Sequence, residues 1–314
     1  MVVDGTKLYE RAMAARLRAA GATARRVPFA HGDVHALDLV GQGSLPPVAL
    51  LHGFSASGPA QFVPMATRLR HHVRRLILPD LPGHGLSSVP VELTAEVLEQ
   101  GLFAALDRLV HPERPVVLFA SSLSGGLSVR YAARHPERVA GLMLCSPGGI
   151  RPTTSELADL SSALSVDSHR KALAFVDRAM AVPRTMRHAY AWGVRRQFSR
   201  PHLQRLIARV DEQPFLDEAE IAALKMPVHI IWGGRDGLLP ARHLQVFRDL
   251  LGDRATVETP EAFCHAPFLH HADELVVRLV RFARRCSKPP NSPAAPVGPS
   301  VGEVTGQDRE ATVA

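Results

Sequence analysis

The chain has 314 residues, 46% of them apolar, which is enough for one sizeable α/β core, and no apolar run is long enough to span a membrane. Its formal charge of +7 is spread along the sequence in short arginine pairs, and aromatic residues make up only 5%. Neither a clustered basic face nor a base-stacking platform is indicated. The composition therefore predicts a globular protein that does not bind nucleic acid and has no transmembrane segment.

The cysteines and the N-terminal segment indicate a cytoplasmic location. Three cysteines are too few and too unevenly spaced for a disulfide framework: Cys145, Cys264 and Cys286. Residues 7–20 carry arginines throughout a helix-like pattern and lack the uninterrupted apolar core of a signal peptide. Histidine pairs such as His71 and His72 have no cysteine or carboxylate at ligand spacing, so we expect no metal site.

After the helix-like N-terminal segment, short apolar runs alternate with amphipathic stretches, which is typical of strands joined by helices in a mostly parallel sheet. The runs expected to form strands are 34–40, 47–51, 75–78, 115–119, 139–144, 228–232 and 256–258. The stretches expected to form helices are 60–69, 94–110, 123–135, 241–251 and 272–284. We therefore predict an α/β fold with a mostly parallel central sheet flanked by helices.

Two segments depart from this alternation. Residues 149–225 contain no convincing strand and consist of helical segments interrupted by Pro183 and Pro201, as expected for an inserted helical cap. Residues 287–314 are rich in Pro, Ser and Gly without periodicity, so we expect a disordered tail. The predicted organisation comprises an N-terminal helix and lead-in, a core in two parts, the cap and the tail: 1–32, 33–148 with 226–286, 149–225 and 287–314.

The most informative segment for chemistry is residues 116–126, with the sequence VVLFASSLSGG. An apolar strand passes through small residues directly into a predicted helix, and such a turn can expose a nucleophile above the sheet without steric collisions. Ser122 stands at the start of that helix, where free N–H groups favour a developing negative charge. For this segment alone, a serine-rich turn that has no catalytic role is the alternative.

This turn resembles the nucleophile elbow, G-x-S-x-G, of the α/β-hydrolase family. Ala120 and Ser124 stand at the positions of its two glycines, and both are small enough to keep the geometry. The resemblance implies that Ser122 is the nucleophile. It also implies that the backbone N–H of Leu123 is one donor of an oxyanion hole.

Two other segments are similar to loops of the same family. Residues 50–54, LLHGF, resemble the H-G oxyanion turn, which implies that the N–H of Phe54 is the second oxyanion donor. Residues 80–87, DLPGHGLS, resemble the D-x-P-G-x-G-x-S loop, which shapes the site without taking part in the chemistry. His84 is therefore expected to be structural.

The remaining candidates lie beyond the predicted cap. Residues 230–236, IIWGGRD, resemble the W-G-x-x-D segment, which implies that Asp236 is the catalytic acid. Residues 263–267, FCHAP, resemble the G-H-x-P loop with Cys264 in place of glycine, which implies that His265 is the general base. The serine, aspartate and histidine occur in the chain order that this architecture requires.

The resemblance implies a serine hydrolase that cleaves a carboxylic ester through an acyl-enzyme on Ser122. No cofactor is required, and the expected substrate is a small ester-like molecule with an apolar portion. Serine at the elbow argues against haloalkane dehalogenase and epoxide hydrolase activity, because those relatives use aspartate there. Hydrolysis of a carbon–carbon bond in a diketone-type substrate stays open, as do lactone, thioester and amide cleavage. A catalytically silent binding protein with this fold is the alternative of another class.

Overall fold

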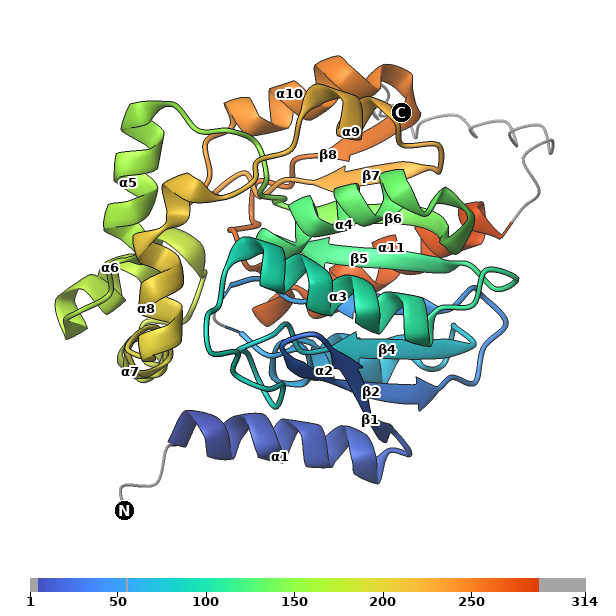
Figure 1. Ribbon diagram of the computed structural model, residues 1–314, viewed down its shortest axis with the longest axis horizontal. Coiled ribbons are helices and arrows are strands. Elements are labelled where there is room, and N and C mark those ends of the chain that lie inside the picture. The colour runs from blue at the N-terminus through green and yellow to red at the C-terminus, as the bar shows by residue number, and fades with distance from the viewer. Residues whose placement is uncertain (1–4, 55, 288–314) are drawn as a thin grey trace, which may run out of the picture.

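Within the described residues, 5–54 and 56–287, eight strands form one open sheet in this computed structural model (Figure 1). In spatial order the strands are β1 (Thr23–Phe29), β2 (Gly32–Val40), β4 (Arg75–Pro79), β3 (Val48–Leu51), β5 (Val116–Ser121), β6 (Val139–Cys145), β7 (Val228–Ile231) and β8 (Ala255–Glu258). The pairs β1–β2 and β2–β4 are antiparallel, and every pair from β4–β3 to β7–β8 is parallel. The predicted fold class is confirmed.

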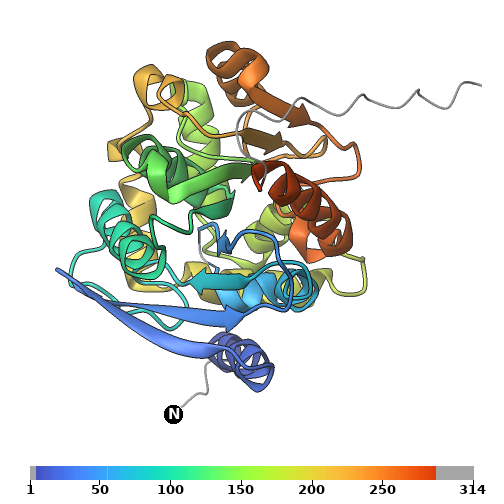
Figure 2. The ribbon, with the colours of Figure 1, turned by 90° about the vertical axis from the view of Figure 1, so that its right-hand side faces the viewer.

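Helices cover both faces of this sheet (Figures 1 and 2). On one face lie α3 (Ala95–Leu109), α4 (Leu123–Arg134) and α10 (Arg242–Leu251), and on the other α1 (Gly5–Ala19), α2 (Gly58–Leu69) and α11 (Ala272–Cys286). Strand β5 is buried along its whole length because its alternate side chains enter both cores. Leu118 belongs to the first core, whereas Val117 and Phe119 belong to the second.

The strand β1 is absent from the sequence prediction, which placed only a helix and a lead-in in residues 1–32. It pairs with β2 over its whole length, from Thr23 opposite Asp38 to Phe29 opposite Gly32. The first four residues of the strand are exposed, and Val27 is the one residue of the strand that is buried. An edge strand of this kind has almost no apolar alternation, so the sequence pattern could not reveal it.

Five helices lie between β6 and β7, at the carboxyl ends of the parallel strands (Figure 1). They are α5 (Thr154–Leu164), α6 (His169–Ala179), α7 (Arg187–Phe198), α8 (Pro201–Ala208) and α9 (Glu218–Ala222). We call this segment the helical insertion. Several of its side chains, including Phe175, Val176 and Phe198, form a small apolar core together with Leu238 of the sheet domain. Within residues 149–225 the structure contains no strand.

The helical insertion is held to the sheet domain by ion pairs between distant parts of the chain. Arg130 on α4 is 6% exposed and donates to Glu220 Oε1 at 2.6 Å and to Glu99 Oε2 at 2.8 Å. Arg200 donates to Glu10 Oε1 of α1 at 3.3 Å, and Glu10 is only 1% exposed. These partly or fully buried pairs fix the position of the helical insertion more firmly than exposed pairs would.

The sequence also predicts a disordered tail and no transmembrane segment. The predicted tail, 287–314, lies outside the described residues except for Ser287. Across the part of the chain that the structure describes, no helix has the length and apolar character needed to cross a bilayer.

The loop after β4 is organised by the fully buried carboxylate of Asp80. Its oxygens lie 2.9 Å from His35 Nδ1 and accept the N–H groups of Gly58 at 2.9 Å and Leu86 at 3.1 Å. Burial alone would raise the pKa of Asp80, but these hydrogen bonds and the neighbouring histidines hold it below its ordinary value. The carboxylate thus fixes both the start of α2, through Gly58, and the loop after β4, through Leu86.

We expect Asp80→Asn to lower the free energy of unfolding by about 3 kcal/mol, because an amide nitrogen would face an N–H donor in a buried site. The depressed folded pKa means that the carboxylate stabilises the fold above pH 4 or so and that this contribution is lost as the pH falls through the folded pKa. The difference between wild type and variant should therefore shrink in acid. Urea unfolding at several pH values would measure it, with the exposed Asp273→Asn as a control that changes little.

Candidate active site

Ser122 occupies a sharp turn between β5 and α4 in a backbone conformation that side chains rarely adopt. Its φ is +53° and its ψ is −120°. The Ser122 carbonyl accepts the N–H groups of Gly125 and Gly148, each at 2.8 Å. The turn also needs a close neighbour without a side chain, since a Cβ added to Gly53 would lie 3.2 Å from the Ser122 Cβ. A strained residue that the surrounding structure holds in place is typical of a functional site.

The structure brings the three predicted catalytic side chains together. His265 Nε2 lies 2.9 Å from Ser122 Oγ, and His265 Nδ1 lies 2.8 Å from Asp236 Oδ2. An ionised carboxylate can only accept, so Nδ1 must carry the hydrogen, and Nε2 is then free to accept the serine hydroxyl proton. Ser122 follows β5, while Asp236 and His265 follow β7 and β8, so all three lie at the carboxyl edge of the parallel strands.

Asp236 is held in place and kept charged by its surroundings. Its other oxygen, Oδ1, accepts the N–H groups of Leu238 at 2.9 Å and Leu239 at 3.0 Å. Burial acts to raise the pKa of Asp236, but His265 and the two N–H groups outweigh it and lower the pKa below its ordinary value. The carboxylate is therefore ionised at neutral pH.

Among the three serines of the turn, the described hydrogen bonds link only Ser122 to His265. Ser124 is fully buried, and its hydroxyl donates to the Leu51 carbonyl at 2.7 Å and accepts the Ser121 N–H at 3.2 Å. Ser121 is the last residue of β5 and pairs with Cys145. Ser124 thus ties the turn to the end of β3, with its side chain away from His265.

The predicted oxyanion donors lie beside Ser122. Leu123 is the first residue of α4, and Phe54 follows Gly53, whose main chain packs against Ser122. The histidine of the H-G turn, His52, accepts the Leu81 N–H at 2.9 Å through Nε2, and its Nδ1 donates to the Gly53 carbonyl at 2.7 Å. Burial lowers the pKa of His52, so the ring is a neutral brace for this turn.

His84 has the structural role that the sequence predicts. It is 1% exposed and its ring lies edge-on to Phe54, with centroids 5.8 Å apart, and 5.4 Å from the ring of His52. Burial, with the nearby His52, lowers the pKa of His84 to about 3. The ring is therefore uncharged, and its contact with Phe54 supports the candidate oxyanion turn.

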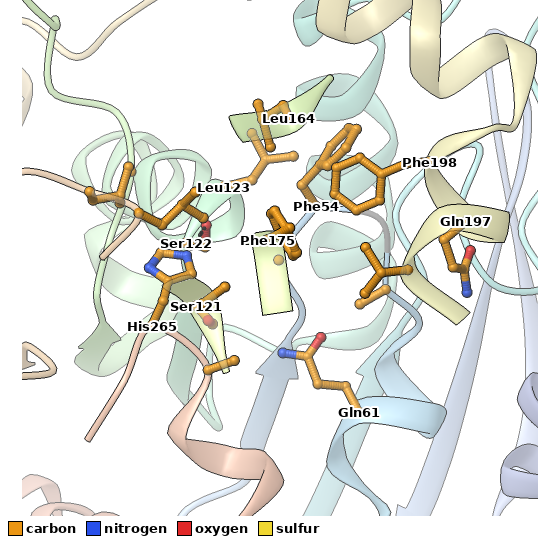
Figure 3. A pocket seen from close by; sticks show the side chains of 18 of the residues that line it. Phe54, Gln61, Ser121, Ser122, Leu123, Leu164, Phe175, Gln197, Phe198 and His265 are labelled. Carbon is orange, nitrogen blue, oxygen red and sulfur yellow. Dashed lines mark hydrogen bonds between the residues drawn. The ribbon is translucent and has the colours of Figure 1, made fainter. Parts of the chain in front are cut away.

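A cavity of about 750 Å³ opens beside Ser122 and His265 and is mostly apolar (Figure 3). The helical insertion contributes Leu160, Leu164, Phe175 and Phe198 to its walls, whereas Val176 packs inside the insertion. In the described residues, no group of three or more His, Cys, Asp or Glu side chains could hold a metal ion.

Sequence reasoning missed the polar and N-terminal parts of this cavity. Tyr9 of α1, Gln61 of α2 and Gln197 of α7 all line it. No sequence pattern could have shown this, because these residues stand on three helices that only the folded chain brings together. The nearest signal was the helix-like pattern of residues 7–20, which predicts α1 but not its place beside the cavity.

Comparison with known proteins identifies the fold family. A family model described as alpha/beta hydrolase fold matches residues 46–172. The crystal structure of a membrane phospholipase A superimposes with a TM-score of 0.73 at 21% identity, covering 90% of this chain and 93% of that one. The chain has the α/β-hydrolase fold. Its sheet agrees with that fold, and the turn at Ser122 with the hydrogen-bonded His265 and Asp236 lies at the carboxyl edge of the parallel strands.

Two relatives of this α/β-hydrolase are named as ester-cleaving enzymes. Lipase 1 of Psychrobacter immobilis is 26% identical over 243 residues, 73% of this chain and 74% of that protein. A pimeloyl-[acyl-carrier protein] methyl ester esterase of Chromobacterium violaceum is 28% identical over 256 residues, 76% of this chain and 94% of that protein. The chain therefore matches most of the length of both relatives.

We expect Ser124→Ala to lower the free energy of unfolding by about 1–3 kcal/mol, because the buried Leu51 carbonyl loses its donor. Ser124→Gly, which places glycine at this position of the elbow, should lower the free energy of unfolding by about 0.5–1 kcal/mol more than Ser124→Ala does, because glycine loses more backbone entropy on folding. Urea unfolding would measure both, with the exposed Ser162→Ala as control. Two variants as stable as wild type would show that the hydroxyl does not tie the turn to β3.

Proposed function

We propose that this α/β-hydrolase is a serine hydrolase that cleaves a carboxylic ester through an acyl-enzyme on Ser122. The observation that carries the proposal is the continuous hydrogen-bonded chain from Ser122 through His265 to Asp236, beside an apolar cavity. The names of the two relatives, a lipase and a methyl ester esterase, favour an ester over other acyl compounds.

In the proposed reaction, Ser122 Oγ attacks the ester carbonyl carbon while its proton passes to His265 Nε2. The carbonyl oxygen becomes an oxyanion, and Asp236 stabilises the imidazolium that forms. Collapse of the tetrahedral intermediate expels the alcohol, which takes the proton from His265. A water molecule then gives a proton to His265 and attacks the acyl-enzyme, which releases the acid and restores Ser122.

The backbone N–H groups of Phe54 and Leu123 are the proposed oxyanion donors. Both flank Ser122, and Leu123 begins α4, so the positive end of the helix dipole is directed at the developing charge. His52 and His84 brace the segment that carries Phe54 as uncharged rings. The donors are therefore preorganised, which is what lowers the barrier in such a site.

The helical insertion, residues 149–225, is proposed to act as a cap that selects the substrate. It supplies apolar walls to the cavity next to Ser122, and an apolar part of the ester would be removed from water there. The proposed substrate is a small ester with an apolar portion, and the proposed chemistry needs no cofactor.

We expect Ser122→Ala and His265→Ala to lower kcat/KM for p-nitrophenyl esters by on the order of 10³-fold or more, because the members of a triad act as a unit. Asp236→Asn should be similarly impaired, because the amide favours the wrong imidazole tautomer. Steady-state kinetics would measure the loss, and circular dichroism would check that the variants fold.

A fluorophosphonate label followed by peptide mass spectrometry distinguishes an activated serine from a silent binding protein. The label should appear on Ser122 in wild type and in Ser124→Ala, and it should disappear in His265→Ala. Modification of Ser121 or Ser124 instead would contradict the assigned nucleophile, and an unlabelled wild-type protein would contradict the enzyme proposal.

The cap proposal predicts that Leu164→Trp shortens the preferred acyl chain, because the larger side chain fills the cavity beside Ser122. Hydrolysis of p-nitrophenyl acetate should be nearly unchanged. Rates for esters of graded acyl length would test this, with Ser162→Trp as the matched control, since Ser162 is exposed on the same helix. If Leu164→Trp has the same chain-length preference as wild type, the cap does not select the acyl chain.

A further inference from the structure

Two glutamine side chains stand out in the apolar cavity because their amide oxygens lack partners. Gln61 of α2 is 7% exposed, lines the cavity, and its Oε1 is buried without a hydrogen-bond partner in the described part of the chain. The same holds for the Oε1 of Gln197, on α7. Figure 3 shows the Gln61 amide directed into the cavity. Gln197 lies on the side of the cavity that is away from Ser122 and His265.

The orientation of the Gln197 amide is fixed by Glu10. The Gln197 Nε2 donates to Glu10 Oε1 at 2.8 Å, and Arg200 donates to the same carboxylate oxygen at 3.3 Å. A carboxylate beside an arginine accepts and does not donate, so the Gln197 nitrogen must face Glu10 and its oxygen must face away. The Gln197 oxygen is therefore left as a buried acceptor without a partner, on a residue that lines the cavity.

The cavity that both glutamines line also has aromatic walls. The ring centroid of Phe198 lies 5.4 Å from that of Phe54 and 4.9 Å from that of Phe175, and all three rings line the cavity. An amide oxygen left without a partner in such a place costs about 1–3 kcal/mol. A ligand group that donates a hydrogen bond would recover this energy, whereas an alkyl group would not.

The charges beside the cavity indicate that this ligand group is neutral. Arg200 is paired with Glu10, and Arg130, which lines the cavity, is paired with Glu99 and Glu220. An anionic group would therefore meet acceptor oxygens beside cations that already have carboxylate partners. A hydroxyl suits either amide, because it can donate to an amide oxygen and accept from an amide nitrogen.

We propose that Gln61 and Gln197 form a polar subsite that binds a neutral hydroxyl group on the apolar part of the substrate. The substrate class is then a hydroxylated ester rather than a purely alkyl one. This inference rests on the proposed ester hydrolysis, and it makes Gln61 and Gln197 determinants of specificity with no part in bond cleavage.

The kinetic test compares alkyl and hydroxylated substrates of equal chain length. One series is p-nitrophenyl decanoate with its monohydroxylated isomers, and the other is decyl acetate with the acetates of monohydroxylated decanols. In wild type, at least one hydroxylated isomer should exceed its alkyl parent in kcat/KM by on the order of 10-fold. Gln61→Met, which keeps the volume and removes the amide, should abolish this preference.

The matched control is Gln245→Met, because Gln245 is exposed on α10 and lies outside the cavity. It should keep the wild-type preference. If no isomer of either series is favoured by wild type, or if Gln61→Met keeps the preference, the polar subsite does not exist and the amides bind only solvent.

A binding test separates failure of this inference from failure of the proposed function. Calorimetric titration of Ser122→Ala with the methyl esters of decanoic acid and its monohydroxylated isomers needs no turnover. Tighter binding of one hydroxylated ester, lost in Ser122→Ala/Gln61→Met, supports the subsite even if wild type hydrolyses no ester. Equal binding of all the esters overturns it even if wild type hydrolyses p-nitrophenyl acetate rapidly.

Discussion

The backbone of Ser122 is the constraint on which the rest of the site depends. A φ of +53° in a residue with a side chain is unfavourable by itself, yet it places the hydroxyl above the sheet, 2.9 Å from His265 Nε2. The fold holds it there through two N–H groups on its carbonyl and through the missing side chain of Gly53. Strain at one residue is thus balanced by hydrogen bonds from the first turn of α4 and from the loop after β6.

Buried charges organise the loops around this turn. Asp236 and Asp80 are both kept ionised by backbone N–H groups and a histidine, but they act on different parts of the site. Asp236 orients the ring that reaches Ser122, whereas Asp80 fixes the start of α2, the helix that carries Gln61 into the cavity. Because each carboxylate has several donors, its position is defined much more sharply than a single ion pair would allow.

The cavity is built where three separate parts of the chain meet at the carboxyl edge of the sheet. The core supplies the Ser122 turn, the helical insertion supplies most of the apolar wall, and α1 closes one side through the contact of Glu10 with Gln197 and Arg200. Such an arrangement separates reactive groups from binding groups. The cavity can therefore change its specificity while the turn and its hydrogen bonds stay the same.

The sequence by itself determined the features that depend on local patterns. Apolar runs and amphipathic stretches predict every parallel strand and its helices, because each period reflects the buried faces of one element. Small residues around Ser122, and the motif-like segments at Asp236 and His265, predict which side chains should meet. Only the tertiary structure decided the rest. Strand β1 is defined by pairing with β2 rather than by burial of its own side chains. The Ser124 hydroxyl turns to β3 because the Leu51 carbonyl is within its reach. Gln61 and Gln197 reach one cavity because helices that are far apart in sequence pack together, and sequence spacing carries no record of such long-range contacts.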